Sequence, residues 1–112
     1  MTAHGQPPER RFSRKVDASA GPEACWPWTG GLTTKGYGQF RIDRKVVKAH
    51  RYAVCVELKV TPEQLSRANV DIHHECENKL CCNPDHLLMI DSNSHARLHA
   101  RDISRRVKRS ST

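Results

Sequence analysis

Three residues of the types that bind zinc fall within one eleven-residue stretch of the sequence. They follow the spacing Cys76-x4-Cys81-x4-His86. Zn²⁺ takes thiolate and imidazole ligands in a tetrahedron, and a structural zinc site is closed by four protein ligands. A fourth ligand must therefore come from elsewhere in the chain, and any fold has to bring it to this stretch.

Three further cysteines are candidates for that fourth position. Cys25 is the best of them, because it lies in a tight loop ahead of the first predicted strand. Cys82 stays an alternative, although its side chain should point away from that of its neighbour Cys81. Cys55 falls inside a predicted helix and is expected to be a small core residue.

The size and cysteine count of the chain favour a metal over disulfides. A chain of 112 residues provides one domain with a modest core, and such domains often need a staple. Five cysteines are an odd number, so a closed disulfide framework would leave one thiol over. Clustered cysteines more often bind metal in a reducing compartment.

The charge of the chain favours a polyanionic partner. The net charge is +7, and nucleic acid is the first partner to expect for a small basic protein. No apolar run approaches the roughly 20 residues of a membrane helix. The N-terminal residues contain no apolar segment of the kind found in secretion signals. We therefore expect a cytoplasmic protein without a membrane partner.

The basic residues are concentrated at the two ends of the sequence. Residues 1–22 carry a net charge of +2, residues 23–96 are neutral, and residues 97–112 carry +5. Both ends are poor in apolar residues. We expect 1–22 to be a flexible basic arm, 23–109 to be the folded domain and 110–112 to be a frayed tail.

Hydrophobic periodicity predicts an α+β fold. Alternating residues indicate strands, whereas apolar residues at positions i, i+3, i+4 and i+7 indicate a helix. Thr61 followed by Pro62 is typical of a helix N-cap. The expected order is a hairpin of strands at 36–42 and 46–48, a helix at 49–58, a short helix after Thr61, strands at 70–74 and 87–90, and a final helix from about Asn93 to Arg109.

Four histidines form a second candidate cluster. His73 and His74 end one predicted strand, and His95 and His99 lie four residues apart on the predicted final helix. Adjacent residues of a strand point to opposite faces. One of the paired histidines can therefore bind a metal while the other serves a different purpose.

The combined pattern resembles the zinc-containing HNH endonucleases that are common in phages and mobile elements. The resemblance covers about residues 25–100, in the order of the family. Its main motif is His73-His74-Glu75-Cys76-x4-Cys81-x-Asn83-Pro84-Asp85-His86-Leu87. The earlier motifs are Cys25-Trp26-x-Trp28-x-Gly30, Gly36-Tyr37-Gly38-x-Phe40 and Ala49-His50-Arg51.

The resemblance implies a ββα-metal fold with a preceding β-hairpin and helix, stapled by a structural zinc. His74 matches the general base of the family. His73 and His95 match ligands of a catalytic divalent metal, and His99 adds a further helical histidine. His86 stands at the position of the middle Asn of the HNH name and is here recruited to zinc.

The expected activity is metal-dependent hydrolysis of DNA phosphodiester bonds. Imidazole ligands suit transition metals, which favours Mn²⁺, Ni²⁺, Co²⁺ or Zn²⁺ as the catalytic ion. Mg²⁺ prefers oxygen ligands and stays a candidate because the DNA phosphate also supplies oxygens. DNA is the expected partner, and the sequence leaves open a homodimer on DNA. If the chain is phage-encoded, it acts in the bacterial host cell. Basic residues available for phosphates are Arg41, Arg44, Lys45, Lys48, Arg97, Arg101, Arg105 and Arg106.

One alternative belongs to a different functional class. A zinc-stapled module could bind DNA without cleaving it. A nuclease that had lost its activity would be expected to lose His74 or a metal ligand, and this chain retains them all. The sequence therefore favours the enzyme, with a disulfide-rich secreted protein as a distant third interpretation.

Overall fold

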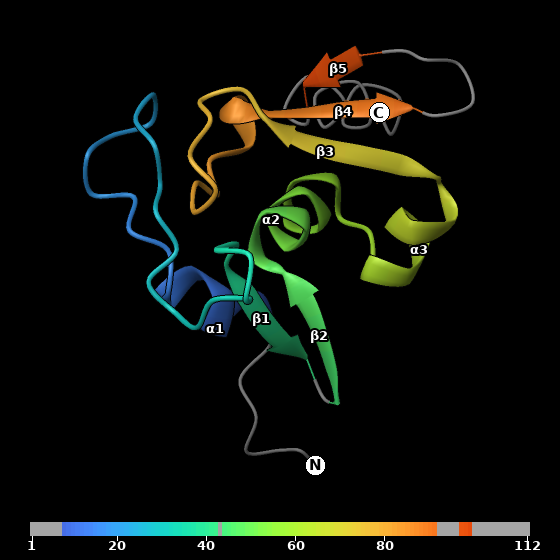
Figure 1. Cartoon of the computed structure of the whole chain (residues 1–112), viewed down its shortest axis with the longest axis horizontal. Helices are drawn as coiled ribbons and strands as arrows, with labels where there is room; N and C mark the ends of the chain where they lie inside the picture. Colours follow the sequence, from blue (N-terminus) through green and yellow to red (C-terminus); the bar gives the residue numbers. More distant parts are fainter. Residues whose placement is uncertain (1–7, 43, 92–96, 100–112) are drawn as a thin grey trace.

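The computed structural model describes residues 8–42, 44–91 and 97–99 and shows a small α+β protein. Two antiparallel sheets enclose a central helix (Figure 1). The elements are α1 (Pro8–Arg14), β1 (Gln39–Ile42), β2 (Lys45–Lys48), α2 (Ala49–Leu58), α3 (Pro62–Arg67), β3 (Val70–His74), the short 3₁₀ helix η1 (Pro84–His86), β4 (Leu87–Asp91) and β5 (Arg97–His99).

The first sheet is the expected hairpin, and it leads directly into the expected helix. In the β1–β2 register Phe40 lies opposite Val47, so apolar side chains share one face. The buried residues of α2 include Ala49, Tyr52 and Ala53, which follow helical spacing. Between the hairpin and the second sheet, α2 forms the centre of the molecule (Figure 1).

The helix α3 begins at a complete capping box. The Thr61 hydroxyl accepts a hydrogen bond from the Gln64 amide, and the Gln64 side chain accepts one from the Thr61 amide. Pro62 occupies the first turn, where no intrahelical donor is required. This local chemistry confirms the helix start that Thr61 and Pro62 predict.

The second sheet has the strand order β3-β4-β5 and carries most of the histidines of interest. Strands β3 and β4 pair along their whole length, with His73 opposite Leu88 and His74 opposite Leu87. Leu87 is fully buried, and Met89 is buried on the same face of β4. The sheet therefore packs one face against the core and leaves the other to solvent.

An aromatic cluster fills the core between α1, the hairpin and α2. The Phe12 ring stacks on Trp28 at 5.2 Å and meets the edges of Phe40 and Tyr52 at 5.4 and 5.0 Å. All four side chains are buried. Such contacts add to the free energy of burying the rings.

The expectation of a flexible arm over residues 1–22 is wrong for residues 8–14. These residues form α1, and Phe12 is only 6% exposed. A single apolar side chain anchors the segment because it completes the aromatic cluster. Residues 1–7 and 110–112 lie outside the described part of the chain.

The expectation of a final helix from Asn93 to Arg109 is wrong where the structure describes that segment. Residues 97–99 form β5, which pairs with β4 in the register Leu88–His99, Met89–Leu98 and Ile90–Arg97. The backbone groups along this edge of β4 are thereby paired. The remaining residues of the expected helix lie outside the described residues.

Within the described residues, no helix is both long enough and apolar enough to cross a membrane.

Candidate functional site

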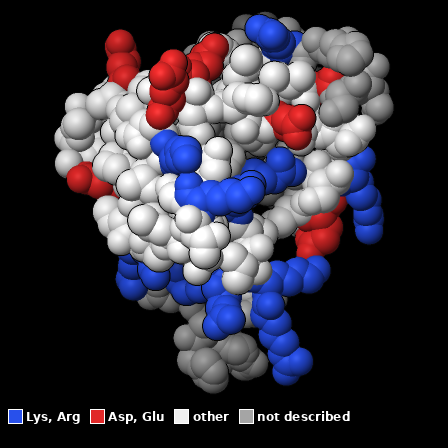
Figure 2. Space-filling view, viewed as in Figure 1, with Lys and Arg blue, Asp and Glu red and all other residues white. Residues whose placement is uncertain are grey.

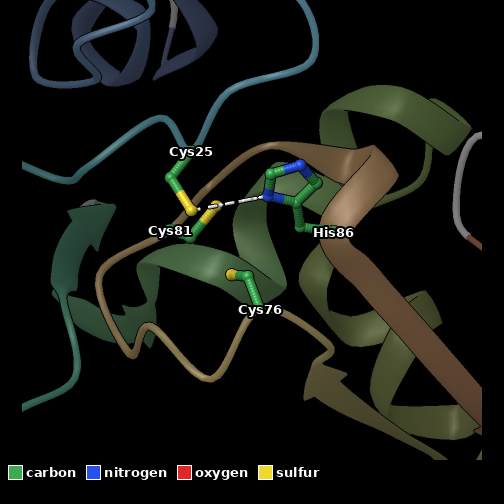
Figure 3. Close-up of side chains that lie close together, drawn as sticks. All are labelled: Cys25, Cys76, Cys81 and His86. Atoms are coloured by element: carbon green, nitrogen blue, oxygen red, sulfur yellow. Dashed lines mark hydrogen bonds between the residues drawn. The ribbon is translucent and has the colours of Figure 1, made fainter.

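Three cysteines and one histidine from separate segments converge on one point. Cys25 lies in the loop after α1, Cys76 and Cys81 lie in the loop between β3 and η1, and His86 ends η1. Their ligand atoms all lie within 4.8 Å of one another. Figure 3 shows the side chains pointing toward a common centre. These are the four residues that the sequence nominated for zinc.

The spacing of the donor atoms fits a tetrahedral ion. The sulfurs of Cys25 and Cys81 each lie 3.5 Å from Nδ1 of His86. Zinc with sulfur at about 2.3 Å and nitrogen at about 2.0–2.1 Å in a tetrahedron separates the two donors by about 3.6 Å. Three thiols and one imidazole are therefore close enough together to hold a metal ion such as zinc.

The orientation of His86 also suits a metal ligand. Its Nε2 lies 3.0 Å from the carbonyl oxygen of Glu23. A carbonyl can only accept a hydrogen bond, so Nε2 carries the proton and Nδ1 presents its lone pair to the cysteines. Metal-binding histidines commonly have this second hydrogen bond, which fixes the tautomer and the ring.

Backbone pairing holds the Cys25 segment against the loop that carries Cys76 and Cys81. The Trp28 amide donates to the Leu80 carbonyl, and the Cys82 amide donates to the Trp26 carbonyl, both at 2.8 Å. The fully buried Asn83 adds a side-chain clamp, because its Nδ2 donates to the carbonyls of Pro22 and Ala24. The arrangement of the loops therefore does not depend on the ligand side chains alone.

The thiols of the group differ in how readily they lose their protons. Burial acts to raise the pKa of the Cys25 thiol, but hydrogen bonds from Cys76, His86, Cys81 and Asn78 outweigh it and lower the pKa. Burial raises the pKa of the Cys81 thiol to about 12. A buried thiol becomes a thiolate only beside a compensating positive charge, and a bound divalent ion supplies one.

The other two cysteines lie outside the group. The Cys82 sulfur is buried and contacts the carbonyl of Leu80 at 3.7 Å. Cys55 is buried within α2, as expected for a core residue. Burial raises the pKa of both thiols, to about 12 and about 11. Neither is placed to serve as the fourth ligand.

Beside the metal-binding group, the structure orients His74 through a backbone carbonyl. Its Nε2 lies 3.1 Å from the carbonyl oxygen of Cys81. Nε2 must therefore donate, which leaves the lone pair on Nδ1 free to accept a proton. Burial lowers the pKa of His74, the Cys81 carbonyl opposes that shift, and the nearby His73 adds to it. The ring is therefore neutral at physiological pH.

His74 belongs to a stack of rings that sequence reasoning did not anticipate. The His50 ring lies 4.4 Å from that of His74, and the Tyr37 ring lies 5.5 Å from His50 and 6.2 Å from His74. His50 is 5% exposed, and its buried Nδ1 has no hydrogen-bond partner among the described residues. Tyr37 and His50 both occur in the motifs that resemble the HNH family, and those motifs were the sequence feature that could have pointed to these two residues.

His73 lies on the opposite face of β3 from His74. Alternation along the strand separates the two side chains, and His73 is exposed. His73 pairs with Leu88 of β4, and Leu88 pairs with His99 of β5, so His73 and His99 lie in one row across the sheet. The His99 Nε2 lies 2.9 Å from a carboxylate oxygen of Glu75.

These histidines do not form a second metal-binding group in the described part of the chain. There, only the three-cysteine, one-histidine group brings three or more potential ligands together. His95 lies outside the described residues, so its expected place beside His73 and His99 is not described.

Basic side chains gather on one face of the molecule. Figure 2 shows Lys and Arg gathered in a band across the middle of the molecule and along its lower edge. Lys48 and Lys79 both contact the Tyr37 ring, with their nitrogens 5.1 and 5.2 Å from its centroid. Lys45 is instead paired with Glu63 at 2.8 Å. Three of the arginines nominated for phosphates lie outside the described residues, namely Arg101, Arg105 and Arg106.

Comparisons with known proteins identify two relatives from one phage. The chain is 38% identical over 65 residues to Protein 2.8 of Escherichia phage T7, which covers 56% of this chain and 40% of the relative. It is 33% identical over 67 residues to Protein 7.7 of the same phage, covering 60% of this chain and 48% of the relative. The chain thus spans less than half the length of either protein, and neither name states an activity. No family model and no solved structure matches the chain.

Proposed function

We propose that the protein is a metal-dependent DNA endonuclease of the HNH type, stapled by a structural zinc. The observation that carries the proposal is the state of His74. Its ring is neutral, its tautomer is fixed by the Cys81 carbonyl, and Nδ1 is free to accept a proton. These are the properties that a general base requires near neutral pH.

In the proposed reaction His74 activates water. Nδ1 removes a proton from a water molecule as the water oxygen attacks the phosphorus of a phosphodiester. The bond from phosphorus to the 3′ oxygen breaks, and that oxygen takes a proton from solvent to leave a 3′-hydroxyl and a 5′-phosphate. The Cys81 carbonyl stabilises the imidazolium that forms, because it accepts a hydrogen bond from Nε2. The tilted ring of His50, with its centroid 4.4 Å away, limits rotation of the His74 ring, so Nδ1 keeps its direction through the step.

The zinc in this proposal has a structural role. All four positions of a tetrahedron are filled by Cys25, Cys76, Cys81 and His86, so no site remains for water or substrate. The ion would fix the Cys81 carbonyl, and through that carbonyl it would fix the orientation of His74. The proposed zinc site and the proposed general base are therefore linked through Cys81.

A second, catalytic ion is proposed on His73, His95 and His99. When bound, a divalent ion supplies Lewis-acid stabilisation of the charge that develops on the leaving oxygen. His73 and His99 share one face of the second sheet, which supports their binding one common ion. Glu75 is a further oxygen donor on this face, at 2.9 Å from His99.

The charge of the described surface supports DNA as the substrate. Phosphate contacts by Lys and Arg supply most of the affinity of DNA-binding proteins. The T7 relatives support a setting in a phage-infected bacterial cell, where phage and host DNA are both present.

Nicking of supercoiled plasmid tests the proposal. Purified protein is incubated with plasmid and, in turn, Mg²⁺, Mn²⁺, Ni²⁺, Co²⁺ and Zn²⁺, and the nicked and linear products are separated on a gel. His74→Ala should slow nicking by about 10²–10⁴-fold at every metal concentration. His73→Ala and His95→Ala should instead raise the metal concentration required, whereas the surface control Lys59→Gln should change neither.

The contrary result favours the other functional class. If no metal supports nicking while the protein retains zinc and binds DNA, the chain is a zinc-stapled DNA-binding module. If His74→Ala cleaves at the wild-type rate, another group is the base and the proposed mechanism fails.

A further inference from the structure

Three segments of the chain meet around the ring of Tyr37. Tyr37 precedes β1, Lys48 ends β2 and is the N-cap of α2, and Lys79 lies in the loop between Cys76 and Cys81. Both lysine nitrogens lie within 5.2 Å of the centroid of the same ring. The chain thus gathers two positive charges beside His74, whose ring lies 6.2 Å from that of Tyr37.

Within the described residues, neither ammonium group is neutralised by a carboxylate. The ion pairs formed there are Lys45 with Glu63 and His99 with Glu75. Lys79 makes one further contact, a hydrogen bond to the carbonyl of Lys35 at 3.1 Å. Both lysines are exposed, so an incoming anion can reach them.

The ring holds the two charges in place without cancelling them. A cation over an aromatic face is attracted by the ring quadrupole but keeps its full charge. Two like charges around one ring also repel each other, and an anion bound between them removes that repulsion. The contact with Tyr37 restricts both flexible side chains before any ligand arrives, which lowers the entropy lost on binding.

We propose that Lys48 and Lys79 form a clamp, ordered by Tyr37, for the phosphates of the DNA strand that enters the His74 site. The inference rests on the proposed function, because it takes the DNA backbone as the ligand. Each ammonium nitrogen lies within 5.2 Å of the Tyr37 ring centroid, and that centroid lies 6.2 Å from the centroid of His74. The sum of these two distances is therefore the greatest possible separation between either ammonium and the His74 ring. Each nucleotide of one strand advances by about 3.4 Å along the helix axis and farther along the strand itself, so that distance covers at most about three phosphates. The clamp therefore positions the backbone within a few nucleotides of the bond to be cleaved.

Salt dependence of DNA binding tests the clamp. The affinity for a short DNA duplex is measured at several salt concentrations by fluorescence anisotropy, without catalytic metal. Lys48→Gln and Lys79→Gln should each make the slope of log affinity against log salt shallower by about 0.9, and the double variant by about 1.8. Lys59→Gln is the matched control, because Lys59 lies at the opposite end of α2 from Lys48, and it should change the slope by less than half as much.

Lysine footprinting gives an independent measurement on the unaltered protein. Acetylation of each lysine is followed by mass spectrometry with and without DNA. DNA should protect Lys48 and Lys79 at least several-fold, while Lys59, at the C-cap of α2, should react equally in both samples. The clamp would be overturned if DNA left the acetylation of Lys48 and Lys79 unchanged, as it should for Lys59. Unchanged salt slopes in folded Lys48→Gln and Lys79→Gln variants would also overturn it.

The clamp and the nuclease proposal fail in different ways. If the wild type nicks plasmid but neutral residues at 48 and 79 leave the slope and KM unchanged, the clamp is refuted and the nuclease stands. If no metal supports nicking but the slopes fall as expected, the nuclease is refuted and the clamp stands as a DNA-backbone site.

Discussion

Replacing His50 with phenylalanine should make the protein less sensitive to acid. His50 is 5% exposed, and burial lowers its pKa from the usual 6.5 to about 3. Positive charge on His74, Lys48, Arg51 and His73 contributes to the same shift. Phenylalanine keeps a ring in contact with His74 but cannot bind a proton. Because the buried Nδ1 has no partner among the described residues, the change should cost little at neutral pH.

The sign of the pH effect follows from the direction of the shift. The folded pKa lies below the unfolded value, so between the two values only the unfolded chain binds the proton. His50 therefore leaves stability intact above about pH 6.5 and reduces it as the pH falls toward 3. At about pH 5 the loss amounts to about 2 kcal/mol. Any folded pKa below about 4 gives nearly the same loss, because the folded ring is then neutral.

Urea unfolding at about pH 7.5 and pH 5 provides the assay. Acid also weakens metal binding by cysteine, but wild type and His50→Phe share the same ligands, so that contribution cancels in the difference between them. The wild type should lose about 2 kcal/mol more than the variant between the two pH values. Equal losses in the two proteins would show that His50 is protonated in the folded state, and the reasoning from its burial would fail.

Four further predictions concern the metal-binding group and the core. Cys81→Ser should abolish stoichiometric zinc and the cooperative thermal transition, whereas Cys82→Ser should retain both, as metal analysis and calorimetry can check. Loss of zinc in Cys82→Ser would show that the fourth ligand has been assigned wrongly. Asn83→Ala should cost about 2–3 kcal/mol and accelerate zinc release to a chromogenic chelator, because two carbonyls lose their donor; unchanged release would exclude a clamping role. Phe12→Ala should lower the free energy of unfolding in urea by about 3–5 kcal/mol. A loss below about 1 kcal/mol would show that Phe12 does not anchor α1 to the core. Gly38→Ala should destabilise the fold, because the added Cβ would lie 2.5 Å from the Trp28 ring; a wild-type melting temperature would contradict that packing.

Local chemistry made much of this structure predictable from the sequence. The β1–β2 hairpin, α2 and β3 follow from apolar spacing, and α3 follows from the Thr61 capping box. The metal-binding group was predictable because thiols and imidazoles at short spacing have few other uses together. Cys25 could be chosen over Cys82 because neighbouring residues cannot easily direct both side chains to one point.

Long-range contacts explain what the sequence did not reveal. Nothing in the local pattern of residues 8–14 shows that Phe12 completes a cluster of three distant aromatic rings. The strand at 97–99 depends on the free edge of β4, which exists only once β3 and β4 have paired. The stack of Tyr37, His50 and His74 joins three separate segments, so spacing along the chain could not predict it.

The wide separation of Cys25 from the other metal ligands has a consequence for synthesis of the chain. Fifty residues lie between Cys25 and Cys76, whereas the other three residues of the cluster lie within eleven residues. At about 5–20 residues per second, a ribosome takes about 3–10 s to make the intervening segment. During that interval Cys25 is an unprotected thiol on a growing chain, without the neighbours that lower its pKa in the folded cluster. A metal ion that uses all four residues can therefore bind only after residue 86 has emerged from the ribosome, and until then the Cys25 thiol depends on the reducing power of its surroundings.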